Sequence, residues 1–498
     1  MASSDVHTAV GYGNWKKPTP NGMFGLGQGA TKVLGVCLIL LFVVAQTAGM
    51  IPALVLGGIG FVVLMSVTQR DADGLNQITK VSVRLGWKKA QRRGSNLYRS
   101  GPLGRTPWGT CQLPGIAAGV SLHEYRDSYG RPFAVLDVRA AGSVVVVLGS
   151  EPEGNSLVDP DQVDRWVAQW GGWLAGLNHL ASIQAAAVTI ETSPDPGTRL
   201  HQEIDAHLDP HAPQLALDIM GALRADSPLG SSRTRSFVTL TFSRTGLGGR
   251  KRTVDDIAAD LANRLPALTG QLEFTGAGAV SPVSAQELCE VIRTAYDPVV
   301  GPLIEQAAAV GQELDLQWSD VGPAAHEATW GEYRHDSGRS VTWMMTEAPR
   351  GVVQSSVLDE LLAPHREIPR KRVTILYRPY APAVATKIVD ADVNAASAQV
   401  SPRPTATQRR AIRSAEKSAE EEASGASLLA FGALFTATVL DPETTDAAEA
   451  VMSNLGPAAR LRLRRAYGSQ DVAFAAALPL GLHLPKFATS PLPMADQR

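Results

Sequence analysis

The chain has 498 residues, of which 44% are hydrophobic and 19% are charged, and its formal net charge is −2. This apolar fraction is enough to form a core, so a chain disordered as a whole is excluded. The near-neutral charge does not indicate nucleic acid as the main partner. Cys37, Cys111 and Cys289 are widely spaced and form no C-x-x-C pair. A disulfide framework and a common structural zinc site are therefore not expected.

Residues 1–30 are polar and rich in glycine, and we expect a cytosolic segment there. Its aromatic side chains Trp15 and Phe24 are predicted to lie near a membrane interface, where aromatic residues are enriched. The two short motifs that we assign to this membrane-proximal role are Tyr12, Gly13, Asn14 and Trp15, and then Phe24 and Gly25.

Residues 33–67 contain no charged side chain. About 20 apolar residues span a bilayer as a helix, so this run predicts a transmembrane hairpin at 31–67, with helices at about 31–48 and 51–67. Gly57, Gly58 and Gly60 would let the two helices approach closely. Basic residues flank the hairpin on both sides, which predicts a multi-pass protein of the inner (plasma) membrane with both termini in the cytoplasm. A single tilted span is the alternative.

Residues 68–115 are basic and rich in turn-forming residues. We expect this juxtamembrane region to contact anionic lipid headgroups. No nucleic-acid-binding motif accompanies the basic residues, and the sequence leaves open whether residues 80–93 do more than contact lipid.

Strands and helices then alternate in two blocks, which we interpret as α+β domains at 116–300 and 301–485, followed by a tail at 486–498. Alternating or continuous apolar runs predict strands at 132–139, 143–149, 185–192, 235–243, 340–346, 372–380, 428–439 and 460–466. Helical periodicity and capping residues predict helices at 159–181, 197–207, 213–224, 253–268, 284–296, 442–455 and 470–477, with a polar helix at about 404–424. The predicted fold class is an α+β body of two ferredoxin-like or related layers, preceded by the transmembrane hairpin.

The sequence contains no motif for a catalytic or cofactor site. A phosphate-binding loop needs the order G-x-x-x-x-G-K-[ST], and the Gly/Arg loop at 244–252 lacks it. Histidines and carboxylates cluster at 201–211, but His201 and His207 are six residues apart, so a helix would point them in different directions. We therefore predict no catalytic residue, no cofactor, no metal site and no enzymatic activity.

The C-terminal part of the chain resembles a known family. A polar helix at 405–424, the strand LLAFGALFTATVL, a helix, the strand RLRLRRAYG and then SQDVAFAAALPLGL follow one another. This order is similar to the end of the N-terminal domain of type IV secretion and conjugation ATPases. Gln470, Phe474, Leu478 and Pro479 match the pattern that leads into the motor domain of that family, and the motor itself is absent.

The apolar hairpin with its preceding motifs is similar to the small two-helix inner-membrane subunit of the same machines. The chain as a whole resembles actinobacterial integral membrane proteins that join these two parts. The resemblance implies a non-enzymatic scaffold of a type IV secretion or conjugation-like apparatus, docked through the four matching residues to a separate ATPase. It also implies contact with other secretion-channel subunits and with the lipid bilayer, within an oligomeric assembly. A type VII secretion membrane subunit and a membrane-tethered enzyme are the alternatives.

Overall fold

The structure is a computed structural model. It describes residues 10–15, 28–47, 49–68, 77–101, 104, 110–152, 154, 157–180, 182–195, 197–209, 211–226, 232–246, 249–312, 314–349, 351–398 and 405–488.

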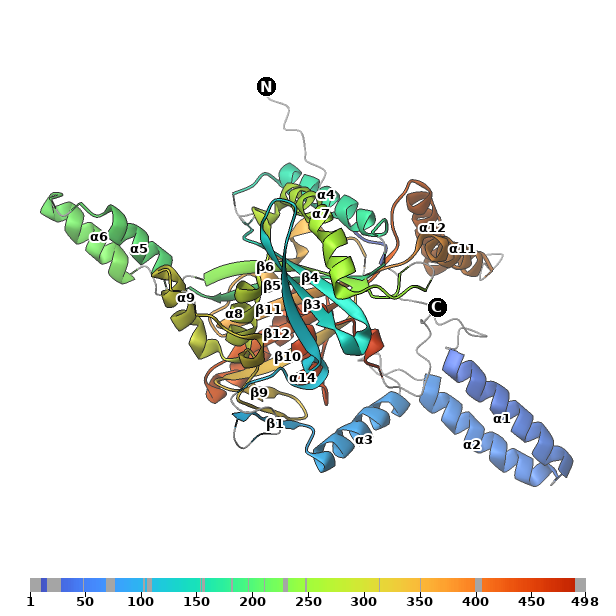
Figure 1. The fold of residues 1–498 in the computed structure, drawn as a ribbon. Helices are drawn as coiled ribbons and strands as arrows, with labels where there is room; N and C mark the ends of the chain where they lie inside the picture. Colours follow the sequence, from blue (N-terminus) through green and yellow to red (C-terminus); the bar gives the residue numbers. More distant parts are fainter. Residues whose placement is uncertain are drawn as a thin grey trace.

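Two apolar helices, α1 (Gln28–Thr47) and α2 (Met50–Thr68), lie side by side (Figure 1). Glycines allow their close approach: a Cβ added at Gly60 would lie 3.2 Å from the sulfur of Cys37, and one at Gly57 would lie 3.0 Å from Leu41. Gly58 faces open space, so only two of the three glycines serve the predicted role. A third helix, α3 (Gln77–Arg93), follows where the sequence indicated a turn-rich region.

The prediction of a transmembrane hairpin is corrected by the structure. Among the described residues, no helix combines the length and the apolar character that crossing a membrane requires. The uncharged run at 31–67 folds as α1 and α2, and it is not supported as a pair of spans. The predicted location as a multi-pass protein of the cell membrane was wrong for the same reason.

The body is organised around one antiparallel sheet, which has thirteen strands in the described residues (Figure 1). Its main path runs β1-β8-β9-β10-β12-β11-β5-β6-β4-β3-β2, with β13 paired to β10 and β7 paired to β4. The strands are β1 (Leu97–Arg99), β2 (Val120–Arg126), β3 (Pro132–Val138), β4 (Ser143–Ser150), β5 (Ile183–Pro194), β6 (Ser232–Ser243), β7 (Val280–Pro282), β8 (Ala325–Ala328), β9 (Tyr333–His335), β10 (Gly338–Glu347), β11 (Arg370–Pro379), β12 (Leu429–Val439) and β13 (Arg462–Arg465).

The predicted fold of two separate ferredoxin-like layers was wrong. Strands β2–β7 form one end of the sheet and strands β8–β13 form most of the other, but β5 pairs with β11 and makes the sheet continuous. This pairing runs from Thr192 opposite Lys371 to Ala186 opposite Tyr377. Alternation along a strand shows which side chains share a face, but it does not identify the partner strand, so the sequence could not reveal this junction.

Helices cover both faces of the sheet. The helices of the body are α4 (Pro160–Leu177), α5 (Thr198–His207), α6 (Gln214–Asp226), α7 (Val254–Leu272), α8 (Ala285–Tyr296), α9 (Gly301–Ala309), α10 (Asp359–Leu362), α11 (Pro382–Ala398), α12 (Ala406–Ala423), α13 (Thr445–Ala458) and α14 (Gln470–Ala476). One face packs against α4 and α7 at one end and against α10 and α13 at the other, while the opposite face packs against α8 and α14.

Local sequence explains several of these helices. Thr253 and Asp256 form a capping box at the start of α7, with reciprocal hydrogen bonds of 2.9 and 3.1 Å. At α8, Ser284 caps the backbone of Glu287 as expected, but the Glu287 carboxylate turns away to bind Arg235 at 2.7 Å. On α4, Trp173 is buried and stacks on the half-buried Trp170, with ring centroids 5.1 Å apart.

Candidate functional site: a groove beside helix α13

The four residues predicted to dock a partner lie inside the fold. Gln470, Phe474, Leu478 and Pro479 are all buried, within α14 and the turn that follows it. Phe474 is fully enclosed, with its ring 5.2 Å from that of Tyr296 and 4.7 Å from that of His335. In this fold these side chains contact the chain itself, so their docking role stays a prediction.

The segment 470–482, here called the strap, crosses one face of the sheet. At its start, the Gln470 side chain binds the backbone of Thr342 on β10. In its middle, the Ala477 carbonyl accepts a 2.8 Å hydrogen bond from Thr374 on β11. Near its end, the Gly481 carbonyl accepts a 2.9 Å bond from Thr241 on β6. The strap therefore ties the two ends of the sheet together.

Beside the strap, the junction of the two sheet halves carries buried charge. Glu191 on β5 receives two hydrogen bonds from Arg372 on β11, at 2.9 and 2.7 Å, and a third from Arg370. Burial opposes ionisation of Glu191, but attraction to Arg372 and Arg370 outweighs it and lowers the pKa of Glu191 to about 2. The Arg372 guanidinium also lies over the Phe474 ring at 5.6 Å, so the charge pair and the strap are in contact.

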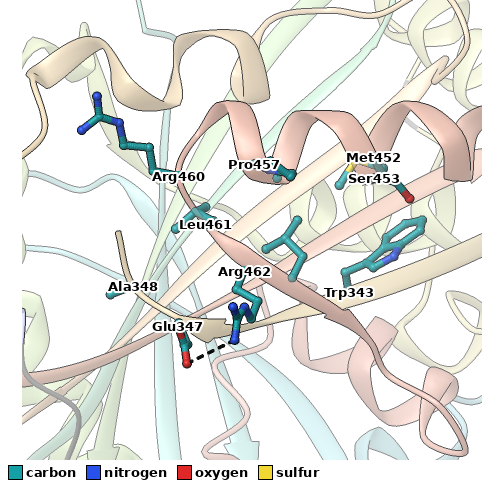
Figure 2. Close-up of a pocket in the computed structure, with 11 residues that line it drawn as sticks. Trp343, Glu347, Ala348, Met452, Ser453, Pro457, Arg460, Leu461 and Arg462 are labelled. Carbon is teal, nitrogen blue, oxygen red and sulfur yellow. Dashed lines mark ion pairs between the residues drawn. The ribbon is translucent and has the colours of Figure 1, made fainter. Parts of the chain in front are cut away.

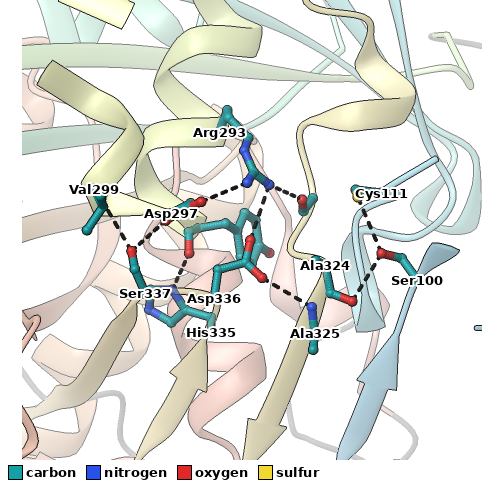
Figure 3. A network of polar contacts seen from close by, with 12 residues as sticks. Ser100, Cys111, Arg293, Asp297, Val299, Ala324, Ala325, His335, Asp336 and Ser337 are labelled. Atoms are coloured by element: carbon teal, nitrogen blue, oxygen red, sulfur yellow. Dashed lines mark hydrogen bonds and ion pairs between the residues drawn. The ribbon is translucent and has the colours of Figure 1, made fainter. Parts of the chain in front are cut away.

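A second polar network fixes the β9–β10 turn, as Figure 3 shows. Arg293 on α8 pairs with Asp297 at 2.8 Å and with Asp336 at 3.2 Å. The fully buried His335 has Nδ1 2.6 Å from the Tyr296 carbonyl, which can only accept, so Nδ1 carries the proton. Its Nε2 then accepts from the Ser340 hydroxyl at 2.7 Å. Each group has a partner within the fold, so this network stabilises the turn and offers no open reaction site.

The candidate functional site is a groove of about 740 Å³ between the C-terminal half of α13 and the paired strands β10 and β13 (Figure 2). Its floor is apolar and its rim carries charge, a combination typical of sites that take a partner's side chains. The groove is lined by Trp343, Glu347, Ala348, Met452, Ser453, Gly456, Pro457, Arg460, Leu461, Arg462 and Leu463.

Packing explains the shape of the groove. Gly456 allows α13 to approach β13, because a Cβ there would lie 3.0 Å from the Leu463 side chain. The helix α13 includes Pro457 and ends at Ala458, and Arg460 takes a left-handed conformation (φ 54°) to turn the chain back into β13. Trp343 from β10 and Leu461 form the buried floor. The sequence RLRLRR at 460–465 predicts alternation in a strand, but it does not show that a helix end leaves one side open.

The rim of the groove is more basic than acidic. Arg460 is exposed, and its Nη1 donates to the Val352 carbonyl at 3.1 Å. Arg462 lies 3.5 Å from Glu347, and Figure 2 shows this pair at the mouth. Among the lining residues, two arginines thus face one carboxylate. The Arg460 and Arg462 residues are both exposed, so their positive charges can attract an acidic ligand.

The other motifs that the sequence singled out do not assemble into sites. In the 201–211 cluster, His207 and His211 are exposed and lie 3.4 Å from the carboxylates of Glu203 and Asp209, respectively. The described residues contain no group of histidine, cysteine and carboxylate side chains that could hold a metal ion. The Gly/Arg loop at 244–252 is a turn in which Arg244 pairs with Asp137 at 3.2 Å.

Of the motifs predicted to lie near a membrane, Tyr12, Gly13 and Asn14 lie against the body, and Trp15 is exposed. Phe24 and Gly25 lie outside the described residues. Comparisons with protein-family models and with curated proteins find no match to this chain.

Proposed function

We propose that the protein is a non-enzymatic docking component of a type IV secretion or conjugation-like apparatus, and that it binds a separate conjugation-type ATPase. The groove beside α13 carries this proposal. A cavity of about 740 Å³ with a tryptophan at its floor and arginines at its rim has the composition of a protein-binding hot spot.

The chemistry of the groove specifies its ligand. The floor of Trp343, Leu461 and Leu463 accepts apolar side chains. The exposed Arg460 and Arg462 favour carboxylates next to those side chains. The expected ligand is therefore a segment of the partner ATPase that carries apolar residues flanked by Asp or Glu.

The sequence resemblance supports the choice of partner. The stretch that resembles the N-terminal domain of conjugation ATPases includes β12, α13, β13 and the strap, and two of these four parts, α13 and β13, line the groove. We therefore propose that the partner is a conjugation-type ATPase supplied by another chain, and that the groove is the surface to which it docks.

The proposal is tested by filling the groove without disturbing the core. Ser453 is exposed on α13 and lines the groove, whereas its neighbour Asn454 is exposed on the same helix and does not. We expect Ser453→Trp to abolish capture of the ATPase by the tagged full-length protein, and Asn454→Trp to leave it intact. Equal capture by both variants would place the docking surface elsewhere.

A further inference from the structure

Residues 10–15 form a short clip that lies against the body, although up to 404 residues separate its contacts in sequence. Tyr12 and Val353 form an antiparallel bridge, with two backbone hydrogen bonds of 2.8 Å each. Tyr12 thus makes, by itself, both of the backbone hydrogen bonds that join two residues in an antiparallel strand pair. The clip behaves as a bound peptide, added to the edge formed by residues 351–353.

Side chains of the clip reach two further elements. The Tyr12 hydroxyl donates to Asp164 on α4 at 3.0 Å. Burial, together with this hydrogen bond to Asp164, raises the pKa of Tyr12 to about 12. The Asn14 amide donates to the Ser418 hydroxyl at 2.9 Å and to the Ser414 carbonyl at 3.2 Å, both on α12, while its oxygen accepts from the Ser414 hydroxyl.

The residue types of the clip fit these contacts closely. A Cβ at Gly11 would lie 2.4 Å from the Val352 side chain, and one at Gly13 would lie 3.0 Å from the Gly351 carbonyl oxygen. Asn14 has a left-handed backbone (φ 70°), which asparagine tolerates better than most residues. The order Gly-Tyr-Gly-Asn is therefore required by the contacts: the glycines allow close approach, and the two polar side chains bind α4 and α12.

We infer that the body carries a binding site for a Gly-Tyr-Gly-Asn segment, which the chain's own residues 10–15 occupy in this structure. The site consists of Asp164, Ser414, Ser418 and the edge 351–353. Its occupancy is coupled to the groove, because the Val352 carbonyl accepts a hydrogen bond from Arg460 at the groove rim. The binding site stands on the contacts alone, and only its effect on the groove rests on the proposed function.

The test uses the full-length chain with Tyr12→Phe and Asn14→Ala. These changes remove the side-chain hydrogen bonds of the clip and leave the residues of its binding site unchanged. Hydrogen exchange at 351–353 and 414–418 is expected to rise about ten- to a hundredfold, because the four side-chain hydrogen bonds of Tyr12 and Asn14 are lost. A capped synthetic peptide of residues 10–15, added in excess, restores the slow exchange. Tyr129→Phe, at an exposed tyrosine elsewhere, serves as the control and leaves exchange unchanged.

A second measurement tests peptide binding to the site separately from any effect of the substitutions on folding. The labelled peptide is titrated into the clip variant and followed by fluorescence anisotropy. The peptide is expected to bind. Its binding is expected to be lost when Asp164→Ala and Ser418→Ala are added to the protein. It is also expected to be lost when Tyr12→Phe and Asn14→Ala are made in the peptide. Binding that is indifferent to these changes, or unaltered exchange in the clip variant, would overturn the inference. No ATPase is present, so this result is independent of the proposed function.

Discussion

The side chain of Gln470 forms, with the backbone of Thr342, the two hydrogen bonds that a neighbouring strand would form. Its side-chain oxygen accepts from the Thr342 amide at 2.8 Å, and its side-chain nitrogen donates to the Thr342 carbonyl at 3.1 Å. Thr342 lies in the gap on one edge of β10 between the part paired with β9 and the part paired with β13. The strap is thus joined to the sheet by a side chain that binds the Thr342 amide and shares the Thr342 carbonyl with the backbone amide of Ala466.

Replacing Gln470 with leucine is expected to destabilise the protein by about 1–3 kcal/mol, because the buried amide of Thr342 loses its partner. The free energy of unfolding in urea measures the effect. Gln312→Leu, at an exposed glutamine, is the matched control and should change this free energy by less than about 0.5 kcal/mol. Equal values for the two variants would show that the strap is not held at this point.

Gly481→Ala is expected to weaken the other end of the strap by about 1–3 kcal/mol. The glycine has φ 57°, and an added Cβ would lie 2.4 Å from the Val145 side chain. Gly425→Ala is the comparison: Gly425 also has a positive φ (97°), but no atom lies within 4 Å of its added Cβ. The difference in the free energy of unfolding between the two variants isolates the steric cost, and a difference near zero would contradict close packing of the strap.

Glu191→Gln is expected to cost about 3–5 kcal/mol, because Arg370 and Arg372 are left buried without a countercharge. The exposed pair of Lys417 and Glu421 gives the control, since Glu421→Gln should cost no more than about 1 kcal/mol. Both values come from urea unfolding at pH 7. If the two substitutions cost the same, the junction of the sheet halves does not depend on this charge pair.

The carboxylate of Glu191 is also expected to make the stability of the protein depend on pH. The folded pKa of Glu191 is about 2, below its ordinary value of 4.5. Its contribution is therefore complete above pH 4.5 and is lost as the pH falls from 4.5 towards 2. The Glu191→Gln variant should show a shallower loss of stability than the wild type in this window. Parallel curves would contradict the assignment.

Much of the local structure could be predicted from the sequence. The capped helices α7 and α8, the polar helix α12 and the strands β10, β11 and β12 form close to where periodicity and capping residues place them. The helices α3 and α11 were missed, the first because its basic composition indicated an exposed, turn-rich region.

What the sequence could not supply is long-range pairing. The junction of β5 with β11 and the return of residues 10–15 to α4 and α12 depend on partners up to 404 residues away. Burial of the strap was missed for a related reason: Gln470 is polar, and its burial is explained by the Thr342 amide, which its side chain binds. The groove was missed because it depends on where α13 ends above β13.

A buried histidine gives a second prediction about the pH dependence of stability. Burial lowers the pKa of His326 to about 4 from its ordinary 6.5, so the unfolded chain binds a proton first as the pH falls. Its contribution is complete above pH 6.5 and is lost between 6.5 and 4. His326→Phe keeps the stacking on Tyr98, whose ring centroid is 5.3 Å away, and removes the titration. The variant should lose less stability than the wild type over this range, whereas His211→Gln, at an exposed histidine, should not differ from it.

The most direct test of the account is capture of the partner ATPase by the tagged full-length protein from cells that express both natively. The wild type and the Asn454→Trp control should retain a conjugation-type ATPase, identified by mass spectrometry. The groove-filling Ser453→Trp variant and the charge-reversed Arg460→Glu variant should lose it, while Arg366→Glu, at an exposed arginine away from the groove, should not. Undiminished capture by the two groove variants, or no ATPase with the wild type, would contradict docking through this groove.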